Sequence, residues 1–471
     1  MDRFIDLHCH STLRPFGNTF KKDDRFNTKS KSSIWYYDKP SMSDKLLDIE
    51  AGFAKFSQAD FTTVSKGNVT VLGVSLYSPE VEFFDNKLGD GSFDKWLENL
   101  ITSYSKERVA EITSPAYRYF DELQAQYKYL ESLHNKTVEI DGENHKFILI
   151  NKFSDLENIQ TSANEKIIAV FVNIEGGHSL GSGQPNFENK ETQILKNVDI
   201  IKKWKYKPVY LTLTHHFMNK LAGHCRSLPD AVNFLAPQQP EMNETIFPLG
   251  LKVINKLLDN TNGKRILVDV KHLSTEGRKL YYELLGTKYA NQNIPIIFSH
   301  GGLNGLKTFD DAWDIIPETK FNNWDIGLFE EEVPIIAKSK GIIGLNMDER
   351  VMSSKKLLKE TKGNGTRYKM RTKYSKLIWN HIQRIAEILD ENNLPAWDFV
   401  SLGTDFDGQI NAINGFWTLE YMNDLETFLN VHAQKYMQTA TLKPKNMIPA
   451  NDIVQKFMCK NAEEFLKQVM V

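Results

Sequence analysis

Eight short apolar runs recur along the chain, each rich in Val, Ile, Leu or Phe. Runs of this length with few polar interruptions are typical of strands buried on both faces of a parallel sheet. Many of them are separated by segments in which apolar residues recur with helical spacing. The predicted strands cover residues 4–10, 69–77, 167–175, 208–214, 265–272, 294–300, 341–347 and 399–405.

The segments with helical spacing complete a repeating pattern of strand and helix. This alternation predicts an α/β fold, and about eight repeats favour a (β/α)8 TIM barrel with a parallel eight-stranded core and enlarged loops. No clean linker interrupts the 471 residues, so residues 1–471 are predicted to form one elaborated barrel domain. The predicted helices cover residues 117–133, 191–205, 249–260, 277–285 and 374–390.

Three connections are longer than a barrel needs, and they are predicted to be insertions near residues 78–166, 304–340 and 351–376. The first contains an expected hairpin over residues 137–150 that turns at Asp141-Gly142. The basic stretch 353–376 is predicted to be a solvated loop, with a mobile lid over the site as the alternative. The tail, residues 451–471, has the pattern of an amphipathic helix packed on the outside.

Composition and charge narrow the function classes. The chain is 41% hydrophobic and 25% charged, which is ordinary for a soluble globular protein, and its net charge of −2 does not favour nucleic acid. No apolar stretch is long enough to span a membrane, and the first strand begins too early for a signal-peptide pattern. The expected compartment is the cytoplasm, unless a signal has been removed. Cys9, Cys225 and Cys459 are too few and scattered for a disulfide framework, and Cys9 is expected to pack as a small residue.

Several predicted strands end in residues that bind metals. Side chains at i and i+2 face the same side of a strand, so His8 and His10 can chelate one cation. A carboxylate at the close of an apolar strand, such as Glu175, needs a partner or a metal, and its two oxygens can bridge two cations. Two further strands end in histidine and the last in aspartate. The candidate ligands are His8, His10, Glu175, His272, His300 and Asp405.

Six nitrogen and oxygen ligands are too many for one tetrahedral zinc ion. They suit two metal ions about 3.5–4 Å apart that share a carboxylate and a water. The predicted chemistry is hydrolysis by attack of a metal-bridging hydroxide. Asp405 and Asp407 are two residues apart, so one of them is expected to bind metal and the other to support it. His215 and His216 follow the fourth strand, and only one of them is expected to face inward.

The order and spacing of these segments resemble the membrane (renal) dipeptidase family of the metal-dependent amidohydrolase superfamily. The resemblance implies a metal-dependent barrel that hydrolyses dipeptides through two zinc ions. The matching segments are Ile5-Asp6-Leu7-His8, Ile174-Glu175-Gly176-Gly177-His178, Tyr210-Leu211-Thr212-Leu213-Thr214-His215, Val268-Asp269-Val270-Lys271-His272-Leu273-Ser274, Phe298-Ser299-His300 and Gly403-Thr404-Asp405-Phe406-Asp407-Gly408.

The resemblance also implies roles for individual residues. Glu175 would bridge the two ions, Asp405 would handle the proton of the attacking water, and His215 would contact the substrate carbonyl. One zinc would be held by His8, His10, Glu175 and Asp405, and the other by Glu175, His272 and His300.

Two departures from the family pattern concern the metal and the substrate. The family usually has aspartate at the position of His10. The histidine in this chain therefore leaves the predicted site with one negative charge fewer. The family arginine that holds the substrate carboxylate is missing after His300. Lys307, Arg226 and Arg350 are the candidate replacements, although a lysine is not equivalent to a bidentate arginine.

Two rival functions remain open at the level of sequence. The opening segment, Asp6-Leu7-His8-Cys9-His10-Ser11, also matches metal phosphoesterases of the polymerase-and-histidinol-phosphatase type. A non-catalytic binding protein with a degenerate site is the other alternative. The expected partner is a dipeptide-like small molecule, with no nucleic acid and no membrane, and a homodimer is left open.

Overall fold

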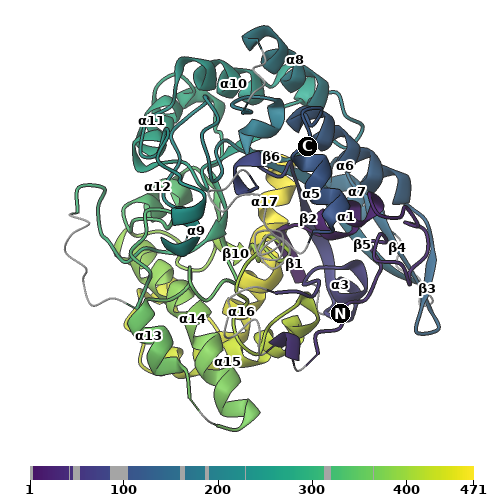
Figure 1. Ribbon diagram of the computed structural model, residues 1–471. Helices are drawn as coiled ribbons and strands as arrows, with labels where there is room; N and C mark the ends of the chain where they lie inside the picture. The colour runs from purple at the N-terminus through teal and green to yellow at the C-terminus, as the bar shows by residue number, and fades with distance from the viewer. Residues whose placement is uncertain are drawn as a thin grey trace.

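Eight parallel strands close into a barrel that is surrounded by helices in the computed structural model (Figure 1). Neighbouring strands follow the order β2-β1-β10-β9-β8-β7-β6-β5, and β5 pairs back with β2 to close the barrel. The structure describes residues 4–41, 43–45, 54–84, 104–159, 165–185, 190–228, 230–311, 320–363 and 365–471. The predicted (β/α)8 barrel is therefore confirmed.

All eight predicted strands are present, and most are shorter than their apolar runs. The barrel strands are β1 Phe4–Cys9, β2 Val69–Tyr77, β5 Glu165–Glu175, β6 Tyr210–Thr212, β7 Leu267–Asp269, β8 Ile297–Gly301, β9 Ile342–Leu345 and β10 Val400–Leu402. The ladders of β7 and β10 stop before His272 and Asp405, whose backbones adopt left-handed conformations with φ of 63° and 60°. The ladders end at Asp269 and Leu402, and a left-handed residue three positions later prevents the strand from resuming.

Helices follow most strands and pack on the outside of the barrel. The five predicted helices are confirmed as α6, α8, α10, α11 and α14; their ends shift by a few residues, except that α14 begins at Arg367 instead of residue 374. The helices are α1 Leu13–Thr19, α3 Phe61–Lys66, α5 Lys106–Ile112, α6 Tyr119–Leu133, α7 Phe153–Glu157, α8 Glu191–Ile201, α9 Asp230–Leu235, α10 Pro248–Leu258, α11 Thr275–Gly286, α12 Glu332–Lys338, α13 Lys355–Thr361, α14 Arg367–Glu391, α15 Met422–Met437, α16 Ala450–Gln455 and α17 Asn461–Val469. Short 3-10 turns cover Val81–Phe83, Gly177–Leu180, Thr261–Gly263, Ala290–Gln292, Leu419–Tyr421 and Pro444–Asn446.

The first insertion carries the predicted hairpin. Strands β3 (Val138–Ile140) and β4 (Glu143–Leu149) pair antiparallel. The turn uses positive φ at both central residues, 52° at Asp141 and 80° at Gly142, as a two-residue hairpin turn requires. Strand β4 then pairs with the first half of β5, so the hairpin extends the sheet beyond the barrel. Residues 85–103, 160–164, 312–319 and 364 of the predicted insertions lie outside the described residues.

The prediction of a solvated loop over residues 353–376 is wrong. Helix α13 and the start of α14 occupy most of it. The hydroxyl of Ser354 accepts a hydrogen bond from the backbone N–H of Leu357, and the hydroxyl of Thr366 accepts one from Lys369. These are N-cap interactions, which satisfy donors that the first helical turn leaves unpaired. Capping and helix-forming lysines therefore outweigh the low hydrophobicity of the segment.

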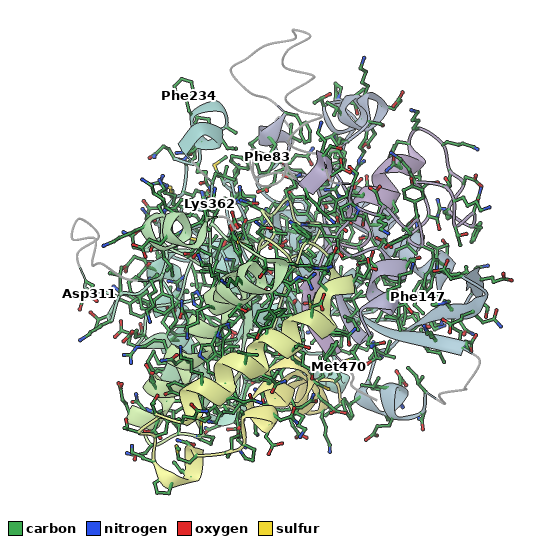
Figure 2. All side chains as sticks on the ribbon, turned by 90° about the horizontal axis from the view of Figure 1, so that it is seen from below. Phe83, Phe147, Phe234, Asp311, Lys362 and Met470 are labelled. Atoms are coloured by element: carbon green, nitrogen blue, oxygen red, sulfur yellow. The ribbon has the colours of Figure 1, made fainter. Side chains whose placement is uncertain are left out.

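The tail is helical, as predicted, although a π-helical turn at Lys456–Lys460 divides it. The side-chain amide of Asn461 donates to the carbonyl oxygens of Trp397 and Val400, which joins α17 to the start of β10. Figure 2 shows Met470 in the lower half of the view and Phe83 and Phe234 near its top. Among the described residues, no helix has the length and apolar character of a membrane span. All three cysteines are buried and none forms a disulfide bond, and Cys9 packs against the Gly73 carbonyl.

His381 joins α14 to the loop after β8 and gives the fold a predicted sensitivity to acid. Its Nδ1 accepts from the Leu303 N–H, and its Nε2 donates to the Met352 carbonyl, both at 3.0 Å. Burial lowers the pKa of His381 from 6.5 to about 4. The unfolded chain therefore binds the proton more readily, and stability present above pH 6.5 is lost as the pH falls toward 4. The expected loss is about 3 kcal/mol of unfolding free energy.

The measurement is urea unfolding of the wild type and of His381→Gln at pH 7, 6 and 5. We expect the variant to lose less unfolding free energy than the wild type across this window, by as much as about 1.4 kcal/mol per pH unit. Other titrating groups are common to both proteins and cancel in the comparison. Parallel pH profiles for the two proteins would show that His381 is not the group responsible.

Candidate metal centre

The six predicted ligand residues come together at one mouth of the barrel. Each lies at or just beyond the carboxyl end of a strand, and parallel strands bring these ends to the same side. The five His and Glu side chains belong to residues that are at most 4% exposed, and the Asp405 side chain is 13% exposed. They contribute to a cavity whose lining includes His10, Glu175, His272, His300 and Asp405.

Glu175 stands between two groups of ligand atoms. Its Oε2 lies 2.7 Å from Nε2 of His10 and 3.5 Å from Nε2 of His8. Its Oε1 lies 3.3 Å from Nε2 of both His272 and His300. The two carboxylate oxygens thus face different pairs of histidines, which is the arrangement that a bridging carboxylate requires.

Asp405 completes the first group. Its Oδ1 lies 3.6 Å from Nε2 of His10 and 3.9 Å from Nε2 of His8, and its Oδ2 accepts from the Asn346 side-chain amide at 3.2 Å. The ligand atoms within each group lie within 4.8 Å of one another. Among the described residues three groups meet this limit, and Glu175 belongs to two of them. These two are His8, His10, Glu175 and Asp405, and Glu175, His272 and His300; the third is His215, His216 and His272.

Hydrogen bonds behind His8 fix which ring nitrogen faces the site. The hydroxyl of Tyr210 donates to the Leu7 carbonyl at 2.8 Å. It has no second proton, so it accepts from Nδ1–H of His8 at 3.0 Å. Nε2 of His8 therefore presents a lone pair toward Glu175. A metal-binding imidazole needs this tautomer.

Hydrogen bonds also fix which ring nitrogen of His300 faces the site, and they show whether the site fits a metal ion. The Ser299 hydroxyl donates to Asp269 at 2.6 Å, so it accepts from Nδ1–H of His300 at 2.8 Å. Nε2 of His300 and Oε1 of Glu175 are then two buried acceptors that face each other, and neither has a hydrogen-bond donor. A cation between them would satisfy both acceptors, so the donor set fits a divalent metal.

The electrostatics of the cluster agree with this fit. Burial and the nearby Glu175 carboxylate raise the pKa of Asp405 to about 8. Burial lowers the pKa of His272 to about 3 and that of His300 well below its usual value, which keeps both rings neutral. Burial opposes ionisation of Glu175, but the surrounding histidines outweigh it and hold its pKa well below the usual value. Neutral imidazoles and crowded carboxylates are the ligands that a divalent cation stabilises.

The backbone conformation at the strand ends positions these side chains. Gly176 has φ of 85°, and a Cβ atom there would lie 2.2 Å from the His178 ring. Only glycine fits this turn. The positive φ of His272 and Asp405 costs of order 1–3 kcal/mol each. The surrounding fold imposes these two conformations on residues that face the site.

His215 lies beside the ligand cluster and is held by a carboxylate that the sequence did not identify. Its Nδ1 lies 2.6 Å from Oε2 of Glu80, and its Nε2 lies 3.7 Å from Oε1 of Glu175. Glu80 also accepts from the Tyr77 hydroxyl and from the Phe217 N–H. Burial alone would lower the pKa of His215, but Glu80 and Glu175 outweigh it and raise the pKa.

Both histidines after β6 face the cavity, so the prediction that only one of them faces inward is wrong. The ring centroids of His215 and His216 are 3.8 Å apart, and both rings line the cavity. Strand β6 ends at Thr212, and the alternation of side chains between two faces does not continue beyond it. Nδ1 of His216 pairs with the Ser227 hydroxyl at 2.7 Å. Only His215 is held by a carboxylate through its Nδ1.

The candidates for holding a substrate carboxylate are placed differently. Arg350 lines the cavity, but its guanidinium is paired with Asp348. Arg226 lies over the Trp324 ring and Lys307 is exposed, and neither lines the cavity. The placement of Arg226 and Lys307 does not support the role predicted for them. Lys271, which the sequence analysis did not single out, lines the cavity instead.

The remaining predicted partner, Asp407, faces away from the cluster. Its carboxylate accepts from the backbone N–H groups of Gln58 and Ala59 and pairs with Arg14 at 2.8 Å. It therefore secures the loop before α3.

Sequence signals for the missed residues do exist. Glu80 follows the end of β2 by three residues, and Lys271 is two residues from Asp269 in an otherwise apolar run.

Comparisons with known proteins agree on the architecture. No family sequence model matches the chain, and no curated protein sequence matches it. A metallo peptidase from Rhodobacter sphaeroides, solved with a phosphinate mimic of the dipeptide L-Ala-D-Ala, is similar with a TM-score of 0.55 and 11% identity, over 99% of this chain and 99% of that chain. The dipeptidase AC, a metallo peptidase of family M19, is similar with a TM-score of 0.50 and 11% identity, over 88% and 89% of the two chains.

A third solved structure, described as a "probable dipeptidase", PvdM from Pseudomonas aeruginosa, is similar with a TM-score of 0.52 and 13% identity, over 88% of this chain and 89% of that chain. Likeness at such low identity concerns the arrangement of the backbone. The chain therefore has the same barrel fold as these metallopeptidases.

Proposed function

We propose that the protein is a metal-dependent hydrolase that cleaves the amide bond of dipeptides or related small acyl-amino acids. The single observation behind this proposal is the position of Glu175, whose two oxygens face two separate groups of histidines. Two zinc ions, or other divalent metals, would be held by these groups. The fold shared with metallopeptidases that are named as dipeptidases supports the same substrate class.

A pair of divalent cations supplies acidification of water and polarisation of a carbonyl group. The chain supplies the proton transfers. Asp405 is the candidate acceptor for the proton of the attacking water, because its Oδ1 faces the cluster while the Asn346 amide holds its Oδ2. The same carboxyl group would return that proton to the leaving amine.

His215 is the candidate for stabilising the oxyanion. Glu80 binds Nδ1 of the ring and leaves Nε2 directed at the cavity near Glu175. Because Nδ1–H is bound to the Glu80 carboxylate, Nε2 carries an N–H only in the protonated ring, the form that the raised pKa of His215 favours. That Nε2–H can donate to the carbonyl oxygen as negative charge develops on it. Glu80 is thus a positioning residue, because it acts on the substrate only through His215.

A substrate panel on the zinc-loaded protein tests this function. We expect turnover of dipeptides or N-acyl-amino acids, no turnover of a phosphate monoester such as p-nitrophenyl phosphate, and about two metal ions per chain by elemental analysis. Phosphatase activity without amide hydrolysis would favour the phosphoesterase alternative. Metal bound in full with no hydrolysis of any substrate would favour a binding protein.

A further inference from the structure

Lys271 is a buried lysine beside the candidate metal ligands. It directly precedes His272, is 1% exposed, and lines the cavity together with Asn346 and Asp405. A Cβ atom added to Gly301 would lie 3.4 Å from its Nζ, so the amine lies against the end of β8. Lysine is rarely buried without a partner, because removing its charge from water is costly.

The carboxylate closest in sequence does not bind this amine. Oδ1 of Asp269 accepts from the backbone N–H groups of Lys271 and Ser299, at 3.1 and 3.0 Å. Its Oδ2 accepts from the hydroxyls of Thr212 and Ser299, both at 2.6 Å. Both oxygens of the Asp269 carboxylate are therefore occupied by these backbone and hydroxyl donors. Nζ of Lys271 lies 5.4 Å from the centroid of the Phe298 ring, and in the described part of the chain no carboxylate, carbonyl or hydroxyl oxygen forms a hydrogen bond or ion pair with it.

Arg350, the arginine that lines the cavity, is already neutralised by a carboxylate. Nε of Arg350 donates to both oxygens of Asp348 at 3.0 and 3.1 Å, and a terminal nitrogen lies 2.5 Å from Oδ2. This close pairing leaves the guanidinium little net charge to offer an anion. Lys271 differs because its charge is not matched by a bonded carboxylate.

The charge of the candidate ligand set adds to this difference. Four of its six members are histidines, and only Glu175 and Asp405 are carboxylates. Two divalent cations would bring four positive charges against these two negative ones. Lys271 increases the positive excess, and a cavity with such an excess favours an anionic substrate.

We infer that Lys271 binds the free carboxylate of the substrate through its Nζ. The substrate class is then a dipeptide or acyl-amino acid that keeps a free C-terminal carboxylate, whereas the corresponding amides are poor substrates. This inference rests on the proposed function. It assigns Lys271 the role for which the sequence offered Lys307, Arg226 and Arg350.

A matched pair of substrates tests the inference on the full-length, zinc-loaded protein. For alanyl-alanine and alanyl-alaninamide, we expect the wild type to prefer the acid by at least about tenfold in kcat/KM. Lys271→Met should raise KM for the acid about 10–100-fold and leave turnover of the amide nearly unchanged, because a charge-assisted hydrogen bond is lost. Arg350→Met and Lys252→Met, a surface residue paired with Glu191, should keep the preference.

Binding measurements separate this inference from the proposed function. Calorimetry with N-acetylalanine and N-acetylalaninamide should show binding of the acid by the wild type and at least tenfold weaker binding by Lys271→Met, even if no peptide is hydrolysed. Metal content should be equal in both proteins. Equal binding of acid and amide by the wild type would overturn the inference. So would loss of the preference in Arg350→Met alone, or an equal loss of acid and amide turnover in Lys271→Met.

Discussion

Replacing Glu175 by glutamine should remove metal binding and hydrolysis together while the barrel stays folded. The carboxylate faces all four candidate histidine ligands, with Nε2 distances of 2.7 to 3.5 Å. An amide of the same size keeps the packing, but it removes the charge and places a donor where a metal ligand is needed. We expect kcat/KM to fall by roughly 10³-fold or more, which corresponds to about 4 kcal/mol.

Metal content by elemental analysis and dipeptide turnover measure this effect on the same preparation. Glu349→Gln is the matched control, because Glu349 is 3% exposed, lies outside the cavity lining and hydrogen-bonds to Asn411. Its variant should keep both metal and activity. Thermal unfolding reports on the fold of each protein. Full metal occupancy and turnover in Glu175→Gln would contradict the bridging role.

Replacing His215 by alanine should lower kcat about 10²–10³-fold with metal content unchanged. This is the loss expected when one donor to a developing oxyanion is removed. Glu80→Gln should lower kcat about 10–100-fold, because the charge-assisted bond that holds the His215 ring at 2.6 Å is weakened. The residue acts through the ring, so Glu80→Gln should add little further loss in the His215→Ala background.

The kcat values of the wild type, the two single variants and the double variant show whether Glu80 acts through His215 or independently of it. Additive losses in kcat would mean that Glu80 does not act through His215. His216→Ala is the informative comparison, since its ring also lines the cavity but its Nδ1 pairs with Ser227 rather than a carboxylate. We expect a loss of less than about tenfold for that variant. A larger loss in His216→Ala than in His215→Ala would reverse the assignment between the two rings.

The local pattern of the sequence was sufficient for the barrel and for finding the residues that gather at its mouth. Strands buried on both faces must be apolar throughout, so the eight runs stood out, and a charged or imidazole residue at the end of such a run is conspicuous. His8 and His10 were paired correctly by the period of a strand. That period does not hold once the ladder ends, which is why His215 and His216 were misjudged.

The sequence by itself determined that the chain forms a parallel barrel and that ligand-type residues end its strands, because strand periodicity and burial act over a few residues. Only the tertiary structure decided which polar groups meet. Glu80 reaches His215 across 135 positions of the chain, and Asp407 turns toward Gln58 instead of the cluster. Arg350 is paired by Asp348 and Lys271 is not. Such partnerships depend on distances between loops from different strands, and closure of the barrel sets those distances.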